Sequence, residues 1–347
     1  MRFLVTPRFI PPPPLPRTID PYQFNPYIVQ TKPYFYFHIP KAAYIQARSA
    51  YRVQYVINSR GFRGPEIILP KPVTVKRLLV VGDSIVEGHG SEFSNTFTHL
   101  LGAHLGRADW EVVNAGVQGA SPVYYAANAE RYAALEPDAV LLMLYENDLW
   151  EDRERELAYF HFPSLDDADR ILYPTAESRR PLSYFYAGLT RLRRNLLRSP
   201  LEQLIADHQK ALKQTNEFQA AVGKGPFALP SALVDRYWQM SQEYLNYFAT
   251  YLQQRKVKLL ITHLSVHSVQ PKSGLSALNY ANSVDHHASR WAKEKKLPFF
   301  SLLPMMHQAF KEKKVAELII KGDGHPTSNT HARIEAALRP WLQQHLD

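Results

Sequence analysis

A serine follows an apolar, strand-like run in the segment RLLVVGDSIVEGHG, residues 77–90. The run ends at Gly82 and Asp83, so Ser84 is delivered to the carboxyl end of its own strand. Serine is a poor nucleophile until a base removes its proton and donors hold the charge that develops on the attacked oxygen. Three later segments offer such groups: NAGVQG at 114–119, YEND at 145–148 and GDGHP at 322–326.

Candidate donors follow three strands of the predicted sheet. The backbone N–H of Ser84 lies where strand gives way to helix, and Gly119 closes the loop of the second strand, where a missing Cβ allows close approach. Asn147 follows the third strand and offers a side-chain amide. Because parallel strands end at one edge of a sheet, these three donors are expected to converge on one oxygen, with Asp148 in support.

The candidate base is His325, and Asp323 lies two residues before it. A carboxylate on the same loop can orient the imidazole and stabilise its protonated form. The order along the chain is therefore Ser84, Asp323, His325. Asp83 is expected to cap the turn after the first strand rather than to act as the acid.

These residues resemble the signature of the SGNH, or GDSL, hydrolase superfamily, whose four named positions match Ser84, Gly119, Asn147 and His325 in order. The resemblance spans about 77–346 and implies an α/β fold: a flavodoxin-like α/β/α sandwich with a parallel five-stranded sheet in the order 2-1-3-4-5. It also implies serine esterase, lipase, deacetylase or acyltransferase chemistry. The chain departs from the family at Tyr145, where glycine is usual, and at Gly322, where the acid is commonly found.

The function expected from this resemblance is hydrolysis of small acyl esters, acetyl esters foremost, with an acylated glycan as a substrate class. An O-acyltransferase that uses the same acyl-enzyme is an open alternative. A non-catalytic glycan-binding or assembly protein of the same fold is a second one.

Alternating strand-like and helix-like segments follow residue 77 and predict a parallel sheet covered on both faces. The expected strands are short apolar runs at 77–82, 110–114, 138–144, 257–263 and 297–302. Helices are expected at 94–106, 121–135, 230–255, 280–295 and 328–346, the last one disturbed at Pro340.

Residues 1–76 form a proline-rich and aromatic N-terminal extension to a hydrolase domain at 77–347. PPPPLP at 11–16 is typical of polyproline II, and 34–58 predicts short strands or a hairpin packed on the main domain. INSRGFRGPE at 57–66 resembles a stretch that precedes the hydrolase domain in many bacterial members of the superfamily.

Residues 150–229 interrupt the alternation and are interpreted as a helical insertion, with a further helix near 200–221. Six arginines and no acidic residue lie between 179 and 198, and apolar residues share one face of an amphipathic segment there. A lid over the active site is the first interpretation, and an interfacial membrane helix is the second.

The composition of the 347-residue chain, with 45% apolar and 21% charged residues, is that of a folded globular protein. The absence of cysteine excludes disulfides and thiolate metal sites but leaves the compartment open. No apolar run reaches the length of a spanning helix, and no export signal is expected in the chain as given. The oligomeric state is likewise open.

Cofactors and other ligand classes find little support in the sequence. The glycines at 82–90 fit neither the dinucleotide fingerprint nor the phosphate loop, and a net charge of +9 gathered largely in one segment does not indicate a nucleic-acid-binding protein. The histidine pairs His263 with His267 and His286 with His287 lack a third metal ligand at a telling spacing. Glu87 and Glu146, like Asp148, are expected to be solvated loop acids.

Overall fold

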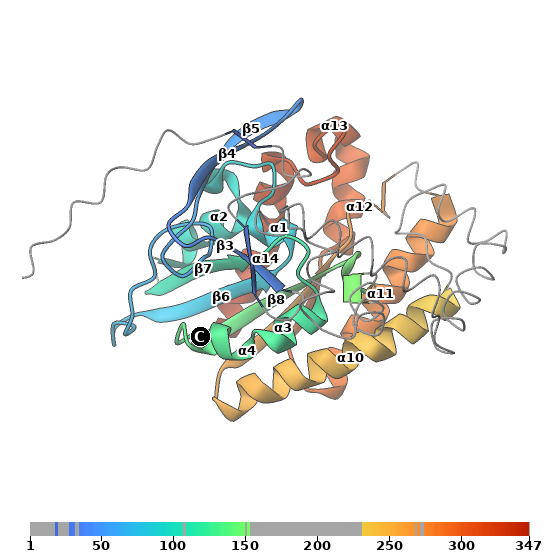
Figure 1. The fold of residues 1–347 in the computed structure, drawn as a ribbon. Helices are drawn as coiled ribbons and strands as arrows, with labels where there is room; N and C mark the ends of the chain where they lie inside the picture. Colours follow the sequence, from blue (N-terminus) through green and yellow to red (C-terminus); the bar gives the residue numbers. More distant parts are fainter. Residues whose placement is uncertain are drawn as a thin grey trace, which may run out of the picture.

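The computed structural model (Figure 1) describes most of the chain outside its N-terminus and the segment 150–229, which the sequence analysis interprets as an insertion. The described residues are 18–19, 28–31, 35–106, 109–149, 151–152, 231–267, 269–270 and 274–346. The polyproline segment and, apart from residues 151 and 152, the insertion at 150–229 therefore lie outside the described residues.

A five-stranded parallel sheet forms the centre of the fold. Its strands are β6 (Lys76–Gly82), β7 (Trp110–Gly116), β8 (Ala139–Tyr145), β9 (Lys258–Leu264) and β10 (Phe299–Ser301). Their spatial order is β10-β9-β8-β6-β7, and every neighbouring pair is parallel. Counted along the chain, this is the order 2-1-3-4-5, so the expected sheet is confirmed.

The two faces of the sheet belong to different parts of the core. On one face, Leu79 and Val81 of β6 pack in a cluster with side chains of α3 (Pro122–Ala127), α4 (Ala129–Ala133), α10 (Ser231–Gln254) and α11 (Gly274–Glu294). On the other, Leu78 and Val80 join a cluster with α2 (Phe97–Leu105), α12 (Leu303–Glu312) and α14 (Ser328–Leu346). Because successive strand residues point to opposite faces, this division makes an α/β/α sandwich (Figure 1).

The helices depart from expectation in detail. The segment expected as one helix at 121–135 is divided at Asn128 into α3 and α4, and α11 begins at Gly274, earlier than expected. The short helices α12 and α13 (Val315–Leu318) lie between β10 and His325. Helix α14 runs through Pro340 to Leu346. Among the described residues, no helix combines the length and apolar character needed to cross a membrane.

The N-terminal region forms small sheets that pack on this domain. Strands β4 (Ala43–Arg48) and β5 (Tyr51–Val56) make the expected hairpin, and β1 (Thr18–Ile19) pairs with β4. Strands β2 (Ile28–Thr31) and β3 (Phe35–His38) form a separate antiparallel pair. Phe37 of β3 belongs to the main core and lies 5.6 Å from the ring of Tyr124 in α3.

The INSRGFRGPE segment connects the hairpin to the turn that follows the first strand of the main sheet. Asn58 Oδ1 accepts hydrogen bonds from the backbone N–H groups of Arg60 and Phe62, and its amide donates to Pro65. These bonds close a turn that directs the Arg63 side chain into the interior, and Arg63 is 1% exposed.

The buried Arg63 guanidinium donates to backbone carbonyls on two elements. It bonds the carbonyls of Gly88 and Ser91, each at 2.7 Å, and that of Gln54 in β5 at 3.1 Å. It also lies 3.8 Å from the centre of the Tyr55 ring. A buried cation of this kind is stable only while its donors are satisfied, so Arg63 fixes residues 88–91 against the hairpin.

Replacing Arg63 with Met should lower the free energy of unfolding by roughly 2 to 4 kcal/mol, because several buried carbonyls lose their donor. Arg60→Met in the same segment removes an exposed guanidinium and should change stability by less than about 0.5 kcal/mol. Urea denaturation followed by circular dichroism measures both. Equal midpoints for the two variants would contradict the role assigned to Arg63.

Candidate active site

Ser84 begins a one-turn helix, α1 (Ser84–Glu87), directly after β6. Asp83 caps this helix by accepting the N–H of Ile85 at 2.9 Å, as the sequence predicts. The turn passes so close to β7 that a Cβ on Gly116 would lie 2.2 Å from the backbone nitrogen of Glu87. A glycine at 116 therefore allows the strand end to lie beneath the helix that carries Ser84.

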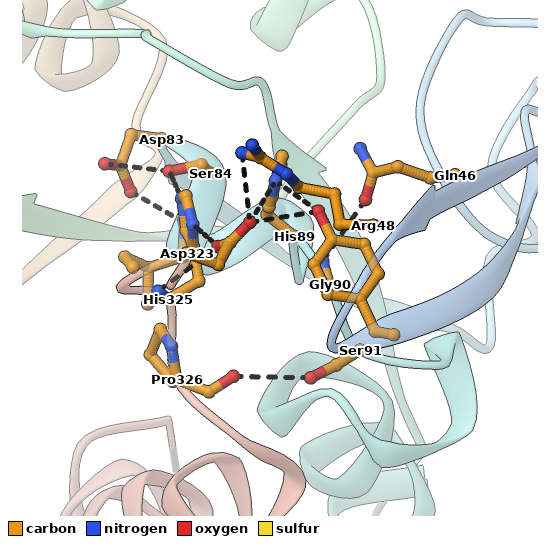
Figure 2. Close-up of polar contacts among 12 residues, drawn as sticks. Gln46, Arg48, Asp83, Ser84, His89, Gly90, Ser91, Asp323, His325 and Pro326 are labelled. Atoms are coloured by element: carbon orange, nitrogen blue, oxygen red, sulfur yellow. Dashed lines mark hydrogen bonds and ion pairs between the residues drawn. The ribbon is translucent and has the colours of Figure 1, made fainter. Parts of the chain in front are cut away.

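The Ser84 hydroxyl meets a histidine from the far end of the chain. Ser84 Oγ lies 2.9 Å from His325 Nε2, and His325 Nδ1 lies 2.5 Å from Asp323 Oδ1 (Figure 2). The tautomer that satisfies both contacts carries its proton on Nδ1, so that the serine hydroxyl donates to Nε2. The structure thus brings Ser84, His325 and Asp323 into one hydrogen-bonded chain.

The loop between α13 and α14 carries both His325 and Asp323. Gly322 and Gly324 flank the acid with φ values of 74° and 96°, which are left-handed conformations that favour glycine. The two-residue spacing lets Asp323 Oδ1 also accept the backbone N–H of His325 at 3.4 Å. Gly322, at the usual acid position of the resembled family, supplies this turn instead.

Electrostatics keep His325 neutral and Asp323 ionised near neutral pH. Burial, together with nearby His89, lowers the pKa of His325 to about 4, although Asp323 acts in the opposite direction. Burial would raise the pKa of Asp323, but hydrogen bonds from His325 and His89 outweigh it and hold that pKa well below its usual range.

The second oxygen of Asp323 faces three side chains that the sequence analysis did not select. The Tyr51 hydroxyl donates to Oδ2 at 3.1 Å, His89 Nε2 lies 3.7 Å from it, and Arg48 NH1 lies 4.0 Å from it. Arg48 and His89 lie across Asp323 from Ser84 in Figure 2. His89 lies in the same sequence segment as Ser84, and this proximity could have marked it as a candidate site residue. Nothing in the local sequence distinguishes Tyr51 in this way.

His89, Asp323 and His325 have ligand atoms within 4.8 Å of one another, a grouping that could hold a metal ion. The two imidazole rings, however, are stacked 4.1 Å apart with an angle of 27° between their planes. Nitrogen lone pairs lie in the ring plane and zinc binds at about 2.0 to 2.1 Å, so two such rings do not aim at one ion. Metal binding would require one ring to leave the stack.

In each of the other histidine pairs considered from the sequence, one histidine has a carboxylate partner. His263 Nδ1 lies 2.9 Å from Asp285, and His287 Nε2 lies 2.7 Å from Asp235. His286 and His287 have ring centres 6.2 Å apart. His267 lies elsewhere, beside Gly324.

The proposed oxyanion donors lie after three adjacent strands, β7, β6 and β8. Gly119 has a φ of 71° in the loop after β7. Asn147, after β8, donates from Nδ2 to Glu151 at 3.0 Å. A primary amide has two N–H groups, so this bond leaves a second one for another acceptor.

Asp148 supports the end of β8 by accepting the N–H of Tyr145 at 3.2 Å. Burial first, and then the nearby carboxylates of Asp83 and Glu151, raise its pKa well above the usual range. Burial similarly raises the pKa of Asp83 to about 7, against the effect of its bond from Ile85. Two buried carboxyl groups with high proton affinity therefore lie beneath the site.

The expectation of solvated loop acids was wrong. Glu87 and Glu146 are fully buried and Asp148 is 2% exposed. Each carboxylate is held by backbone N–H groups: Glu146 accepts those of Val266 and His267, at 2.9 and 2.6 Å. Loop acids become buried where strand ends leave unpaired backbone donors for them to satisfy.

Glu87 joins two loops of the site. Its Oε2 accepts the N–H of Gln118, next to Gly119, at 2.6 Å and lies 3.3 Å from His38 Nε2. Burial would raise the pKa of Glu87, but His38 and His89, with the bond from Gln118, lower it to about 2. Glu87, the last residue of the helix that Ser84 begins, is thus bonded through its buried carboxylate to the loop after the second strand.

Comparison with known proteins gives structural likeness only. No protein-family model and no curated protein sequence matches the chain. The fold is similar to that of TesA, at 17% identity and a TM-score of 0.44, covering 78% of this chain and 99% of that one. It is also similar to a catalytic mutant of Axe2, an acetylxylan esterase from Geobacillus stearothermophilus, at 14% identity and a TM-score of 0.45, covering 79% and 95%.

A third similar structure is a putative lipolytic protein of the G-D-S-L family from Desulfitobacterium hafniense, at 11% identity and a TM-score of 0.42. It covers 76% of this chain and 98% of that one. Two of these structures are thus named as an acetylxylan esterase and as a putative lipolytic protein of the G-D-S-L family, both at low sequence identity. The chemistry proposed below is based on the side chains of this chain.

Glu87→Gln should lower the free energy of unfolding by roughly 3 kcal/mol at pH 7, because it removes a buried carboxylate whose ionised form the fold stabilises. The pKa of Glu87 is lowered by folding, so its contribution is present above about pH 4.5 and is lost as the pH falls toward 2. The stability difference between wild type and variant should therefore shrink across that window. Urea titrations at several pH values measure it.

Glu92→Gln is the matched control, because Glu92 is exposed and lies five residues further along the same turn. Its effect should stay within about 0.5 kcal/mol at every pH. A Glu87 variant whose stability difference is constant from pH 7 to pH 2 would show that folding does not lower the pKa of this carboxylate.

Proposed function

We propose that the chain is a serine esterase in which Ser84 is the nucleophile, His325 the general base and Asp323 the group that orients it. The observation that carries this is the continuous contact from Ser84 Oγ to His325 Nε2, at 2.9 Å, and from His325 Nδ1 to Asp323, at 2.5 Å. A base within hydrogen-bond reach of a serine, itself held by a carboxylate, is the arrangement that activates a hydroxyl.

In the proposed reaction, His325 Nε2 takes the Ser84 proton as Oγ attacks the carbonyl carbon of an ester. The tetrahedral intermediate collapses when His325 returns that proton to the leaving alkoxide, which breaks the ester C–O bond and leaves an acyl group on Ser84. Water then attacks the acyl carbon as His325 takes its proton, and the bond to Ser84 Oγ breaks as His325 returns that proton to Oγ, which releases the carboxylic acid and restores the serine. The lowered pKa of His325 supports its acting as a base, because the ring is neutral at physiological pH.

Charge on the attacked oxygen is assigned to three donors: the backbone N–H groups of Ser84 and Gly119 and the side-chain amide of Asn147. Their positions after adjacent strands support this assignment, since strand ends of a parallel sheet share one edge. Asp83 and Asp148 are assigned supporting roles in holding α1 and the end of β8. The proposed substrate is a small acyl ester, with acetyl groups on a glycan as the class that the SGNH/GDSL resemblance implies.

A serine-directed fluorophosphonate should label the folded protein, and Ser84→Ala should abolish the labelling, because only an activated hydroxyl attacks the phosphorus. Ser265→Ala is the control: Ser265 is also buried and follows strand β9 of the same sheet. Labelling is measured by intact-protein mass. If the wild-type protein has the circular dichroism spectrum of a folded protein but is not labelled, a glycan-binding protein without catalysis is favoured.

Asn147→Ala should lower kcat by roughly 10²- to 10³-fold on a model acetyl ester, about 3 to 4 kcal/mol, if the amide holds the oxyanion. kcat and kcat/KM should fall together, because the interaction forms in the transition state. Asn329→Ala, at an exposed position on α14, should leave both constants unchanged. A wild-type rate in the Asn147 variant would show that this residue is not an oxyanion donor.

A further inference from the structure

The outer oxygen of Asp323 is bonded by a residue of the N-terminal hairpin. Tyr51, the first residue of β5, donates its hydroxyl to Asp323 Oδ2 at 3.1 Å across a separation of 272 residues. The same hydroxyl lies 3.1 Å from His89 Nε2. The Asp323 side chain is 1% exposed, so these contacts are made away from bulk water.

The proton inventory of this cluster fixes the direction of its hydrogen bonds. A phenol has one proton, and an ionised carboxylate only accepts, so Tyr51 donates to Asp323. Tyr51 then accepts from His89, which places a proton on His89 Nε2. The donors run in one direction, from His89 through Tyr51 to Asp323.

His89 also touches the candidate base directly. Its ring is stacked on that of His325 with centroids 4.1 Å apart, and His89 is 1% exposed. A stacked, buried ring restricts rotation of His325 about its side-chain bonds, while Asp323 restricts tilting by holding Nδ1. Both groups that restrain His325, the His89 ring and the Asp323 carboxylate, are hydrogen-bonded to the Tyr51 hydroxyl.

The hairpin itself is held at this position. Gly90 N donates to Gln46 Oε1 of β4 at 3.3 Å, and a Cβ on Gly90 would lie 3.2 Å from the Tyr51 ring. Arg63 bonds the carbonyls on both sides, at Gly88 and Ser91. Residues 88–91 are therefore clamped between the hairpin and the serine, and Tyr51 has little freedom to leave Asp323.

We infer that Tyr51 and His89 are positioning residues of the active site, and that the β4–β5 hairpin is part of the catalytic apparatus rather than an appended extension. This inference rests on the proposed function. Tyr51 holds Asp323 in the plane where it meets His325 and offsets part of its negative charge. His89 donates a hydrogen bond to the Tyr51 hydroxyl and covers one face of the His325 ring.

Tyr51→Phe tests the inference because it removes one hydroxyl and keeps the ring that packs on Gly90. The kcat of a model acetyl ester should fall roughly 10-fold or more, as expected for a bond to a charged group, with little change in KM. Without the phenol, Asp323 holds the His325 proton more strongly, so the acid limb of the kcat/KM profile should move to higher pH from its expected place near pH 4.

Tyr55→Phe is the matched control. Tyr55 lies on the same strand and is fully buried, and its hydroxyl has no hydrogen-bond partner among the described residues. Both the rate and the acid limb should match the wild type. A second variant, His89→Gln, keeps a donor toward Tyr51 but removes the ring that lowers the pKa of His325, so its acid limb should also move upward.

Among the described residues, the titratable groups that act on His325 come from its own loop, from the turn after α1, from the loop after β9 and from α14: Asp323, His89, His267 and His331. Tyr51 and Arg48 of the hairpin act on His325 through Asp323.

The outcomes separate this inference from the proposed function. A Tyr51 variant that matches Tyr55→Phe overturns the inference, and so does one that loses rate while its acid limb stays in place, because a merely structural role has that effect. If Ser84→Ala retains the wild-type rate, the proposed function itself fails. If Ser84→Ala loses activity and Tyr51→Phe is unaffected, the proposed esterase function is supported and only the catalytic role of the hairpin is overturned.

Discussion

A buried carboxylate, Asp323, is the point on which the arrangement of this site depends. Removing a carboxylate from water is costly unless donors replace the lost solvent. Asp323 obtains those donors from His325 on one oxygen and from Tyr51 on the other, with Arg48 and His89 nearby. The need to satisfy one charge thus brings the N-terminal hairpin, the turn after Ser84 and the loop before α14 to the same place.

Much of the framework could be predicted from the sequence because it depends on local patterns. Five short apolar runs gave strands within a residue or two of β6 to β10, and buried parallel strands leave few other readings for such runs. Strand topology places Ser84 at the carboxyl edge of the sheet. The loop of His325 and Asp323 lies between α13 and α14 and does not directly follow a strand, so its meeting with Ser84 was expected from the resemblance to the SGNH/GDSL signature.

The features that sequence reasoning missed depend on partners far away in the chain. Glu87 and Glu146 have the composition of solvated loop residues, and only the folded strand ends show which backbone donors they satisfy. Tyr51 has no local mark that distinguishes it from other hairpin tyrosines.

The carboxylate of Glu87 has a consequence for how the site meets a substrate. It joins the turn that carries Ser84 to the backbone beside Gly119, and its charge has no access to solvent. Separating the two loops would strand an ionised group in a dry interior, so their spacing is set before any ester arrives. An enzyme built in this way would spend little free energy on reorganising its dipoles as the reaction proceeds.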